Sequence, residues 1–173
     1  MVTIGLFYGS MTGNTEEVAD LIADALAMGV SAKRVDEVPP NKWVDYDVLI
    51  LGVPTWNIGE LEDSWEEVIP LFSSIDLSSK LVFLFGLGDQ ESYPDTFVDA
   101  LGIIYDKITS QGAVVDGKWS SSGYEFEESL ALRDGQFVGL VLDEDNQPDL
   151  TEDRVNQWVS EVKARILETQ ILA

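Results

Sequence analysis

The sequence of 173 residues contains no cysteine and no histidine. Without cysteine, disulfide bonds, thiolate nucleophiles and iron–sulfur ligation are excluded. Without histidine, the protein lacks the commonest general base and the commonest zinc ligand. The composition therefore excludes an enzyme built on a Ser-His-Asp triad or on a histidine-ligated zinc ion.

Positive charge is also scarce, because 10 lysines and arginines face 32 aspartates and glutamates, for a net charge of −22. Such a protein repels nucleic acid and anionic membrane surfaces and attracts basic proteins. No apolar run approaches the ~18 residues of a membrane span, and the first residues do not show the pattern of a signal peptide. We expect a soluble, cytoplasmic protein with no nucleic-acid or membrane partner.

The length and the apolar content are those of an ordinary folded domain. Apolar residues make up 45% of the chain, which is enough for a core. We find no repeat, no low-complexity segment and no linker, so the sequence predicts one domain over residues 1–173.

Hydrophobic periodicity predicts strands that alternate with helices. The strands are expected at residues 2–8, 31–35, 46–53, 81–85 and 113–115, with the last one continued at 137–142. The helices are expected at residues 15–28, 62–72, 94–111 and 151–167. This alternation is typical of a doubly wound α/β fold with one parallel sheet, in which ligands bind at the carboxyl ends of the strands.

Local signals refine these boundaries. Pro54 is expected to end the third strand, Pro94 suits the first turn of a helix, and Thr151 suits an N-cap. A polar and aromatic segment at residues 118–136 divides the last strand as an insertion. Its Trp119, Tyr124 and acidic neighbours favour either a lobe for partner contact or a lobe that only packs on the sheet.

The loop after the first strand gathers hydroxyl, amide and backbone donors at the start of a helix. Ser10, Thr12 and Thr15 supply hydroxyls, Asn14 supplies an amide, and glycines flank them. Such a loop suits a phosphate. It has no Walker lysine, and phosphoryl transfer needs cationic groups and Mg²⁺, so we expect an anchor for a phosphate that does not react. The alternative is a plain capped strand–helix turn.

Two further loops carry aromatic residues at strand ends. Trp56, just beyond the third strand, could stack on a flat ring, or could merely cover the edge of the sheet. In residues 86–93, Asp89 could accept a hydrogen bond from a ring N–H and Tyr93 offers a second aromatic face, although this could also be an ordinary glycine turn. The segment lacks the third glycine of a dinucleotide fingerprint. Together, the three loops predict a phosphorylated flat heterocycle between two aromatic rings.

These motifs resemble those of the flavodoxins. The resemblance covers nearly the whole chain and implies a single five-stranded parallel sheet in the order 2-1-3-4-5 with helices on both faces, an order for which flavodoxin is itself the standard example. The insertion is similar to that of the long-chain subgroup, and the overall pattern is similar to the second flavodoxin type of gamma-proteobacteria. The matching segments are Ser10-Met11-Thr12-Gly13-Asn14-Thr15, which fits T/S-x-T-G-x-T, then Pro54-Thr55-Trp56, then Gly86-Leu87-Gly88-Asp89-Gln90 followed by Tyr93, and residues 137–151.

The resemblance implies flavin mononucleotide (FMN) as the cofactor, with no catalytic residue and no metal. Trp56 and Tyr93 would flank the isoalloxazine ring, Asp89 would accept from its N3–H, and the Asn57–Ile58 peptide would face its N5. Asp145 would approach the ribityl chain through water. The implied cofactor-binding residues are Ser10, Met11, Thr12, Gly13, Asn14 and Thr15 around the phosphate, and Pro54, Thr55, Trp56, Asn57, Ile58, Gly59, Gly88, Asp89 and Tyr93 around the ring.

Two residues depart from the pattern of the family. Ser92 stands where relatives often carry glycine, so the turn before Tyr93 is expected to be shaped differently. Asn57 occupies a position that is often glycine in relatives whose peptide flips on reduction. Asparagine tolerates a left-handed backbone less well than glycine does. We therefore expect a smaller separation of the two one-electron potentials than in glycine-bearing relatives.

The resemblance implies a low-potential electron carrier that shuttles single electrons and has no substrate of its own. Its partners would be a ferredoxin/flavodoxin NADP⁺ reductase and acceptor enzymes, docked on an acidic face, and we expect a monomer. Carboxylates near the flavin would lower its potential and steer association; the alternative is that they only solvate the surface. The acids near the two aromatic loops are Glu60, Glu62, Asp63, Glu66, Glu67, Asp89, Glu91, Asp95 and Asp99.

Other functions are possible on the same topology. An FMN-dependent NAD(P)H quinone or azo reductase is the main alternative. A signalling receiver domain needs acidic residues at the end of the first strand, where Tyr8 to Ser10 supply none. A calcium loop at residues 143–148 fails because Pro148 stands where an EF-hand requires glycine.

Overall fold

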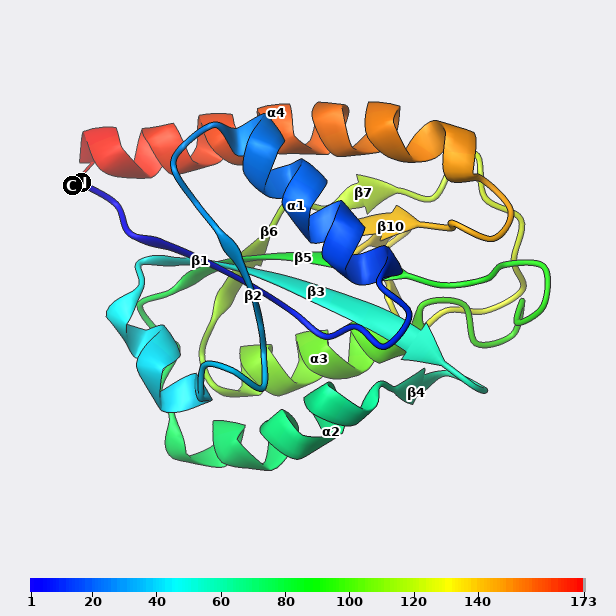
Figure 1. Cartoon of the computed structure of the whole chain (residues 1–173), viewed down its shortest axis with the longest axis horizontal. Helices are drawn as coiled ribbons and strands as arrows, with labels where there is room; N and C mark the ends of the chain where they lie inside the picture. Colours follow the sequence, from blue (N-terminus) through cyan, green and yellow to red (C-terminus); the bar gives the residue numbers. More distant parts are fainter. Residues whose placement is uncertain (173) are drawn as a thin grey trace.

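The computed structural model describes residues 1–172, which form one large sheet, a small sheet and four α-helices (Figure 1). The strands are β1 (Ile4–Tyr8), β2 (Ala32–Arg34), β3 (Val48–Trp56), β4 (Glu60–Leu61), β5 (Leu81–Leu87), β6 (Val114–Asp116), β7 (Trp119–Ser120), β8 (Leu132–Arg133), β9 (Gln136–Phe137) and β10 (Leu140–Leu142). The α-helices are α1 (Asn14–Leu26), α2 (Asp63–Val68), α3 (Asp99–Ser110) and α4 (Thr151–Leu172). Short 3₁₀ helices cover Pro40–Asp45, Ile69–Ser74 and Pro148–Leu150.

The large sheet confirms the predicted topology. Its parallel strands follow the order β10-β5-β3-β1-β2. β6 pairs with the first part of β5, from Leu81 to Phe83, whereas β10 pairs with the last part, from Phe85 to Leu87. β6 and β10 are thus the two pieces of one edge strand, and the segment between them forms the small sheet β7-β9-β8. This is the 2-1-3-4-5 order with a divided last strand.

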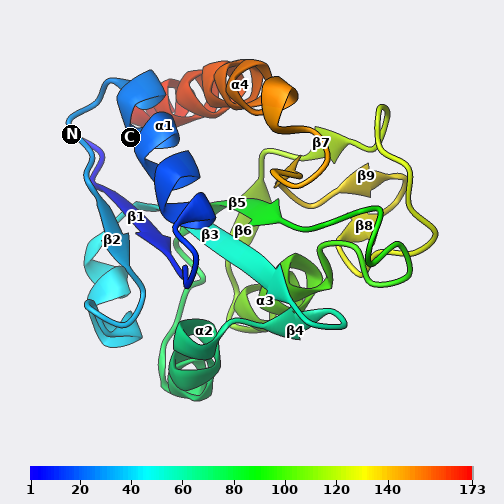
Figure 2. The same ribbon diagram turned by 45° about the vertical axis from the view of Figure 1, so that its right-hand side comes forward.

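Alternation along β3 distributes apolar side chains to both faces of the sheet. Val48 and Ile50 belong to the cluster that α1 and α4 cover, whereas Leu49, Leu51 and Val53 belong to the cluster that α2 and α3 cover. Successive residues of a strand point to opposite faces, so a strand covered on both sides is apolar throughout. Figures 1 and 2 show the two helical layers on either side of the sheet.

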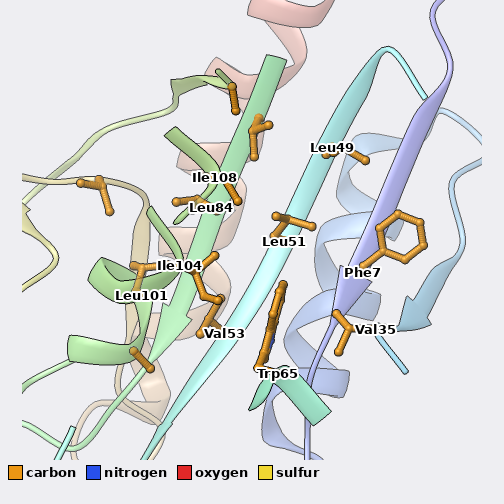
Figure 3. Close-up of a cluster of buried hydrophobic side chains, with 14 of the residues drawn as sticks. Phe7, Val35, Leu49, Leu51, Val53, Trp65, Leu84, Leu101, Ile104 and Ile108 are labelled. Atoms are coloured by element: carbon orange, nitrogen blue, oxygen red, sulfur yellow. The ribbon is translucent and has the colours of Figure 1, made fainter. Parts of the chain in front are cut away.

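Aromatic side chains pack together in the core on each face of the sheet. On one face, the ring of Phe7 stacks on Trp43 with centroids 5.0 Å apart, and Trp65 meets Trp43 edge-on at 6.0 Å. Figure 3 shows Trp65 and Phe7 beside the apolar residues of β3 and α3. On the other face, Trp158 of α4 packs edge-on against Phe83, and its indole N–H donates to the carbonyl oxygen of Gly117 at 2.8 Å. These contacts fix both layers on the sheet.

Several predicted boundaries are wrong, each for a local reason. The helix expected at 62–72 is α2 only to Val68 and then tightens to a 3₁₀ helix, because Pro70 has no N–H to donate. The helix expected from Pro94 begins at Asp99, and the carbonyl oxygen of Pro94 instead accepts from the N–H groups of Glu127 and Glu128 in the insertion. The segment before α3 is therefore hydrogen-bonded to the insertion and does not extend the helix.

The N-cap and strand signals also need correction. Thr151 is already helical and its hydroxyl donates to the Glu144 carboxylate, so it does not cap α4. Phe137 belongs to β9 of the small sheet, and the resumed edge strand begins at Leu140. Within residues 1–172, no helix combines the length and the apolar content that a membrane crossing requires.

Candidate cofactor-binding site

A cavity of about 340 Å³ lies where the segments that follow β1, β3, β5 and β10 converge. Figure 2 shows the ends of β1, β3 and β5 and the loops that follow them. The predicted site residues that line the cavity are Thr12, Asn14, Thr15, Pro54, Thr55, Trp56, Asn57, Gly88, Asp89 and Tyr93. The other lining residues are Leu87, Thr96, Phe97, Val98, Glu144 and Asp145. The predicted residues Ser10, Met11, Gly13, Ile58 and Gly59 are not part of the lining.

The loop after β1 is shaped by its own first hydroxyl. Gly13 has φ 94°, a left-handed conformation that favours glycine, and its N–H donates to Ser10 Oγ at 3.0 Å. The Ser10 side chain is thus committed to the loop itself. α1 begins at Asn14, so the first N–H groups of the helix have no partner within it. Free N–H groups beside the hydroxyls of Thr12 and Thr15 make an anion site.

An arginine on the neighbouring strand contacts this loop, which the sequence did not indicate. Arg34 at the end of β2 donates to the Ser10 carbonyl oxygen at 2.8 Å and pairs with Asp36 at 3.0 Å. Its pKa is raised, first by the hydrogen bond to Asp36 and further by the fields of Asp36 and Glu62. The loop therefore has a cation beside it although its own sequence has none. The parallel pairing of β1 with β2 brings the two together.

The loop after β3 is a hairpin. β3 continues through Pro54 to Trp56 and pairs with β4 antiparallel, so the expected end of the strand at Pro54 is wrong. The turn uses left-handed backbones at Asn57, with φ 46°, and at Gly59, with φ 77°. The Asn57 amide donates to Glu60 Oε2 at 2.8 Å. Pro54 can lie within β3 because β1 pairs with β3 only as far as Gly52, so Pro54 has no partner in β1.

Thr55 carries an orphaned polar atom on the cavity wall. Its Oγ1 is buried and has no hydrogen-bond partner within residues 1–172. A buried hydroxyl without a partner costs about 1–3 kcal/mol. Thr55 itself is part of the cavity lining.

The loop after β5 is organised by Asp89. Its Oδ1 accepts from the N–H groups of Glu91 at 3.1 Å and Ser92 at 2.9 Å, and from the Asn146 amide at 2.8 Å. Burial acts to raise the pKa of Asp89, but the hydrogen bonds outweigh it, led by the one from Ser92, and the pKa is lowered. Ser92 avoids a left-handed backbone, and the turn closes by a bond from Tyr93 N–H to the Asp89 carbonyl oxygen at 3.0 Å.

A buried carboxylate behind this loop was missed by the sequence analysis. Asp143 is 0% exposed and accepts from Gln90 N–H at 3.0 Å, from the Gln90 amide at 2.7 Å and from the Asn146 amide at 2.9 Å. The amide oxygen of Gln90 accepts from Glu125 N–H at 2.7 Å, which links the insertion to the same network. Gln90 belongs to the matched motif, but its partner lies 53 residues away.

The acidic segment after β10 reaches the cavity, where Asp145 is part of the lining. Burial raises the pKa of Asp145, and the charges of Asp89 and Asp143 raise it further. Glu144 also lines the cavity. Negative charge thus gathers at this side of the cavity.

The wall between Tyr93 and α3 contains a strained residue. Val98 is fully buried, lines the cavity and has φ 49°, which is a genuine outlier for a β-branched side chain. A Cβ on Gly88 would lie 2.9 Å from Val98 Cγ1, so only glycine fits there. Strain of this kind persists where the surroundings over-determine it, often at ligand sites.

The insertion packs on the same wall. Phe126 lies 5.4 Å from Phe97, and Tyr124 lies 5.3 Å from Phe137, ring centre to ring centre. The Tyr124 hydroxyl donates to the Val141 carbonyl oxygen at 2.5 Å, and burial raises its pKa to about 12. Because Phe97 lines the cavity, the insertion supports that wall from behind.

Comparisons with known proteins agree with this geometry. A family model described as Flavodoxin matches residues 6–158. The chain is 49% identical to the flavodoxin of a Nostoc species over 162 residues, which cover 93% of this chain and 95% of that one. It is 45% identical to flavodoxin 1 of Salmonella typhimurium, with 99% of each chain covered. A crystal structure of Fusobacterium nucleatum flavodoxin bound to flavin mononucleotide matches with a TM-score of 0.90 and 34% identity, over 95% of this chain and 99% of that one.

Proposed function

The chain belongs to the flavodoxin family, and from this premise we propose that it binds FMN in the cavity and carries single electrons between other redox proteins. The observation that carries the proposal is the convergence of an anion loop, an orphaned hydroxyl and two aromatic side chains on one cavity. The cavity lies within the range of small-molecule sites, roughly 300–1,000 Å³.

The donors at one end of the cavity fit a phosphate. The helix N-terminus at Asn14 and Thr15 offers backbone N–H groups, and the Thr12 and Thr15 hydroxyls can donate as well. Arg34 adds positive charge from behind the loop without entering the lining. These residues would hold the phosphate as an anchor, because the loop supplies no lysine and so lacks the usual cationic clamp for phosphoryl transfer.

The other end of the cavity fits a flat ring. Trp56 and Tyr93 stand on the two loops that border it and would flank the ring, while the Thr55 hydroxyl would bind one of its polar atoms. The Asn57–Ile58 peptide would face N5. Asp89 already accepts three hydrogen bonds on Oδ1. A ring N3–H would therefore donate to Asp89 Oδ2 or to a backbone carbonyl oxygen of the loop.

When bound, FMN supplies the redox chemistry by accepting and releasing electrons. The chain tunes this chemistry through its charge, since Asp89, Glu144 and Asp145 all line the cavity. One carboxylate ~10 Å from a reduced, anionic flavin opposes it by roughly 0.4–1.7 kcal/mol for a dielectric constant between 80 and 20. A one-electron potential falls by ~59 mV for about 1.4 kcal/mol. Several such carboxylates would make the protein a strong reductant.

The same acids would attract basic partners. A reductase that delivers electrons from NADPH, such as a ferredoxin/flavodoxin NADP⁺ reductase, and the acceptor enzymes would dock where Tyr93 and Ile58 are exposed, at 43% and 74%. Charge complementarity would mainly speed association, and salt would slow it. We propose that the protein acts in this way as a monomer.

Adding FMN to the flavin-free protein tests the proposal. We expect uptake of one FMN per chain, with quenching of flavin fluorescence by Trp56 and Tyr93. The loaded protein should not oxidise NADPH unless a reductase is added, and the rate with a reductase should fall as ionic strength rises. Failure to take up FMN would refute the proposal, and NADPH oxidation by the protein alone would favour a quinone or azo reductase.

A further inference from the structure

Glu62 is a carboxylate buried directly behind the phosphate loop. It precedes α2 and is only 2% exposed, whereas the acidic residues Asp63 and Glu66 in the first turn of α2 are exposed. Buried carboxylates are rare unless they are paired. Within residues 1–172, no lysine or arginine forms an ion pair with it.

The position of this carboxylate is fixed by contacts on two sides. The Ser64 hydroxyl donates to Glu62 Oε2 at 2.5 Å. The same oxygen rests against Gly9, since a Cβ on Gly9 would collide with it and would also lie 2.6 Å from Trp65 Cδ1. Trp65 is itself held by a bond from its indole N–H to the Gly52 carbonyl oxygen at 2.9 Å. Gly9 is the residue before Ser10, so the charge lies at the base of the phosphate loop.

Arg34 contacts the same loop from the neighbouring strand. Its guanidinium donates to the Ser10 carbonyl oxygen at 2.8 Å, one residue beyond Gly9. The charge of Glu62 is among the causes that raise the pKa of Arg34, after the hydrogen bond and the charge of Asp36. The base of the loop therefore lies between a buried negative charge and a half-exposed positive charge.

We propose that these two side chains set the affinity of the loop for a phosphate group with opposite signs: Glu62 weakens it and Arg34 strengthens it. The proposal rests on the binding of FMN argued above. A phosphate dianion held by neutral N–H and hydroxyl groups keeps most of its charge. Fixed charges beside it therefore act on it strongly, and a buried charge is screened less by salt than an exposed one.

Two flavins distinguish an effect on the phosphate from an effect on the rest of the cofactor. Riboflavin carries the same ring and ribityl chain as FMN but has no phosphate. A charge that acts on the phosphate changes the affinity for FMN and leaves the affinity for riboflavin unchanged. A side chain that merely supports the fold of the loop or cavity changes both affinities together.

The test is to titrate the flavin-free protein and its variants with FMN and with riboflavin at pH 7. Glu62→Gln keeps the size of the side chain and its ability to accept from Ser64, and it removes the charge. We expect this variant to bind FMN at least fivefold more tightly and riboflavin within twofold of the parent. Arg34→Gln should bind FMN at least fivefold more weakly, again with riboflavin unchanged. The gain in Glu62→Gln should persist when the salt concentration is raised.

Glu66→Gln is the matched control, because it removes an exposed carboxylate from the same helix and should change neither affinity by more than twofold. Ser64→Ala removes the hydrogen bond and keeps the charge of Glu62, so it should not tighten FMN binding. Equal shifts for FMN and riboflavin, or weaker FMN binding by Glu62→Gln, would overturn the inference. If Glu62→Gln does not fold, Glu62→Ala takes its place with the same expected result, and Arg34→Gln tests the role of Arg34 independently. A parent protein that binds neither flavin would instead refute the proposed function.

Discussion

The two aromatic walls of the cavity are built in different ways. The Trp56 wall is a short hairpin whose shape lies in its backbone: two strand pairs, two left-handed residues and one exposed side-chain bond between Asn57 and Glu60. The Tyr93 wall is held by side chains, because Asp89 and the fully buried Asp143 accept hydrogen bonds from two segments of the chain, residues 90–92 and 145–146.

Because of this difference, the Trp56 wall can change its conformation locally and the Tyr93 wall cannot. The Asn57–Ile58 peptide of the hairpin can rotate at the cost of a few backbone torsions, since both residues are exposed. Moving the Tyr93 loop would break several buried hydrogen bonds at once, and such networks resist partial change. We therefore expect structural responses to the redox state of the cofactor on the hairpin, while Tyr93 keeps its place.

The largest expected effect comes from removing the centre of the side-chain network. Asp143→Ala leaves the Gln90 amide, the Gln90 N–H and the Asn146 N–H without their acceptor. We expect a loss of about 3 kcal/mol or more in the free energy of unfolding, measured by urea denaturation. Hydrogen exchange should accelerate in residues 89–93 and stay unchanged in the hairpin.

Asp149→Ala is the control for this change, since Asp149 is exposed and should alter stability by less than about 0.5 kcal/mol. Equal acceleration of exchange in both walls would contradict the contrast drawn between them.

The second substitution changes the backbone preference of a hairpin residue. Gly59→Ala meets a left-handed φ of 77°, and its Cβ would lie 2.9 Å from Asp99 Oδ2. We expect a loss of about 2 kcal/mol in the free energy of unfolding and a weakened affinity for FMN. Gly135→Ala, at φ 81° with open space around it, isolates the cost of the backbone alone. If the two variants lose the same stability, the close packing against Asp99 does not matter.

A third substitution relaxes the hairpin. Asn57→Gly removes the strain of a left-handed asparagine at φ 46°, but it also gives the unfolded chain more freedom and loses the bond to Glu60. These terms oppose each other, so stability should change by less than about 1 kcal/mol. The separation of the two one-electron potentials should widen, because glycine lets the peptide rotate more freely. Redox titration in which the parent and the variant give the same separation would refute this expectation.

The smallest expected effect is electrostatic and depends on pH. The folded-state pKa of Asp145 is raised, so its charged form destabilises the folded protein. Asp145→Asn should therefore be slightly more stable than the parent, by less than about 0.5 kcal/mol at pH 7. The advantage should shrink as the pH falls through the folded-state pKa, and it should vanish below the unfolded-state value of about 4.

The charge of Asp89 has the opposite effect on stability, because the folded-state pKa of Asp89 is lowered. Its charged form stabilises the Tyr93 wall above an unfolded-state pKa of about 4, and this stability is lost as the pH falls through the folded-state pKa. Thermal melting of Asp89→Asn and Asp145→Asn between pH 3 and pH 7 separates the two, since their differences from the parent should have opposite signs at neutral pH.

The sequence predicted the sheet well because its signals are local. The apolar runs of β3 and β5 and the glycine-rich loop before Asn14 carry their own patterns, and parallel strands bring their ends together. The loops that follow these strands accordingly meet at one cavity.

The missed features all depend on partners distant in sequence. Asp143 lies 53 residues from Gln90, and Arg34 lies 24 residues from Ser10, so no periodicity connects them. Pro94 was misplaced because its carbonyl oxygen bonds to the insertion. The left-handed Val98 contradicts its own β-branched preference, and only the surrounding packing holds it there.

The divided edge strand has a consequence for behaviour at high concentration. An exposed edge with a long row of free N–H and C=O groups invites other chains to add a strand, which leads to aggregation. Here one edge consists of the short pieces β6 and β10, interrupted where the insertion leaves the sheet, and the opposite edge is the three-residue β2, which carries Lys33. Neither edge offers a long template. The short and interrupted edge strands thus protect a strongly apolar parallel sheet against aggregation by strand addition.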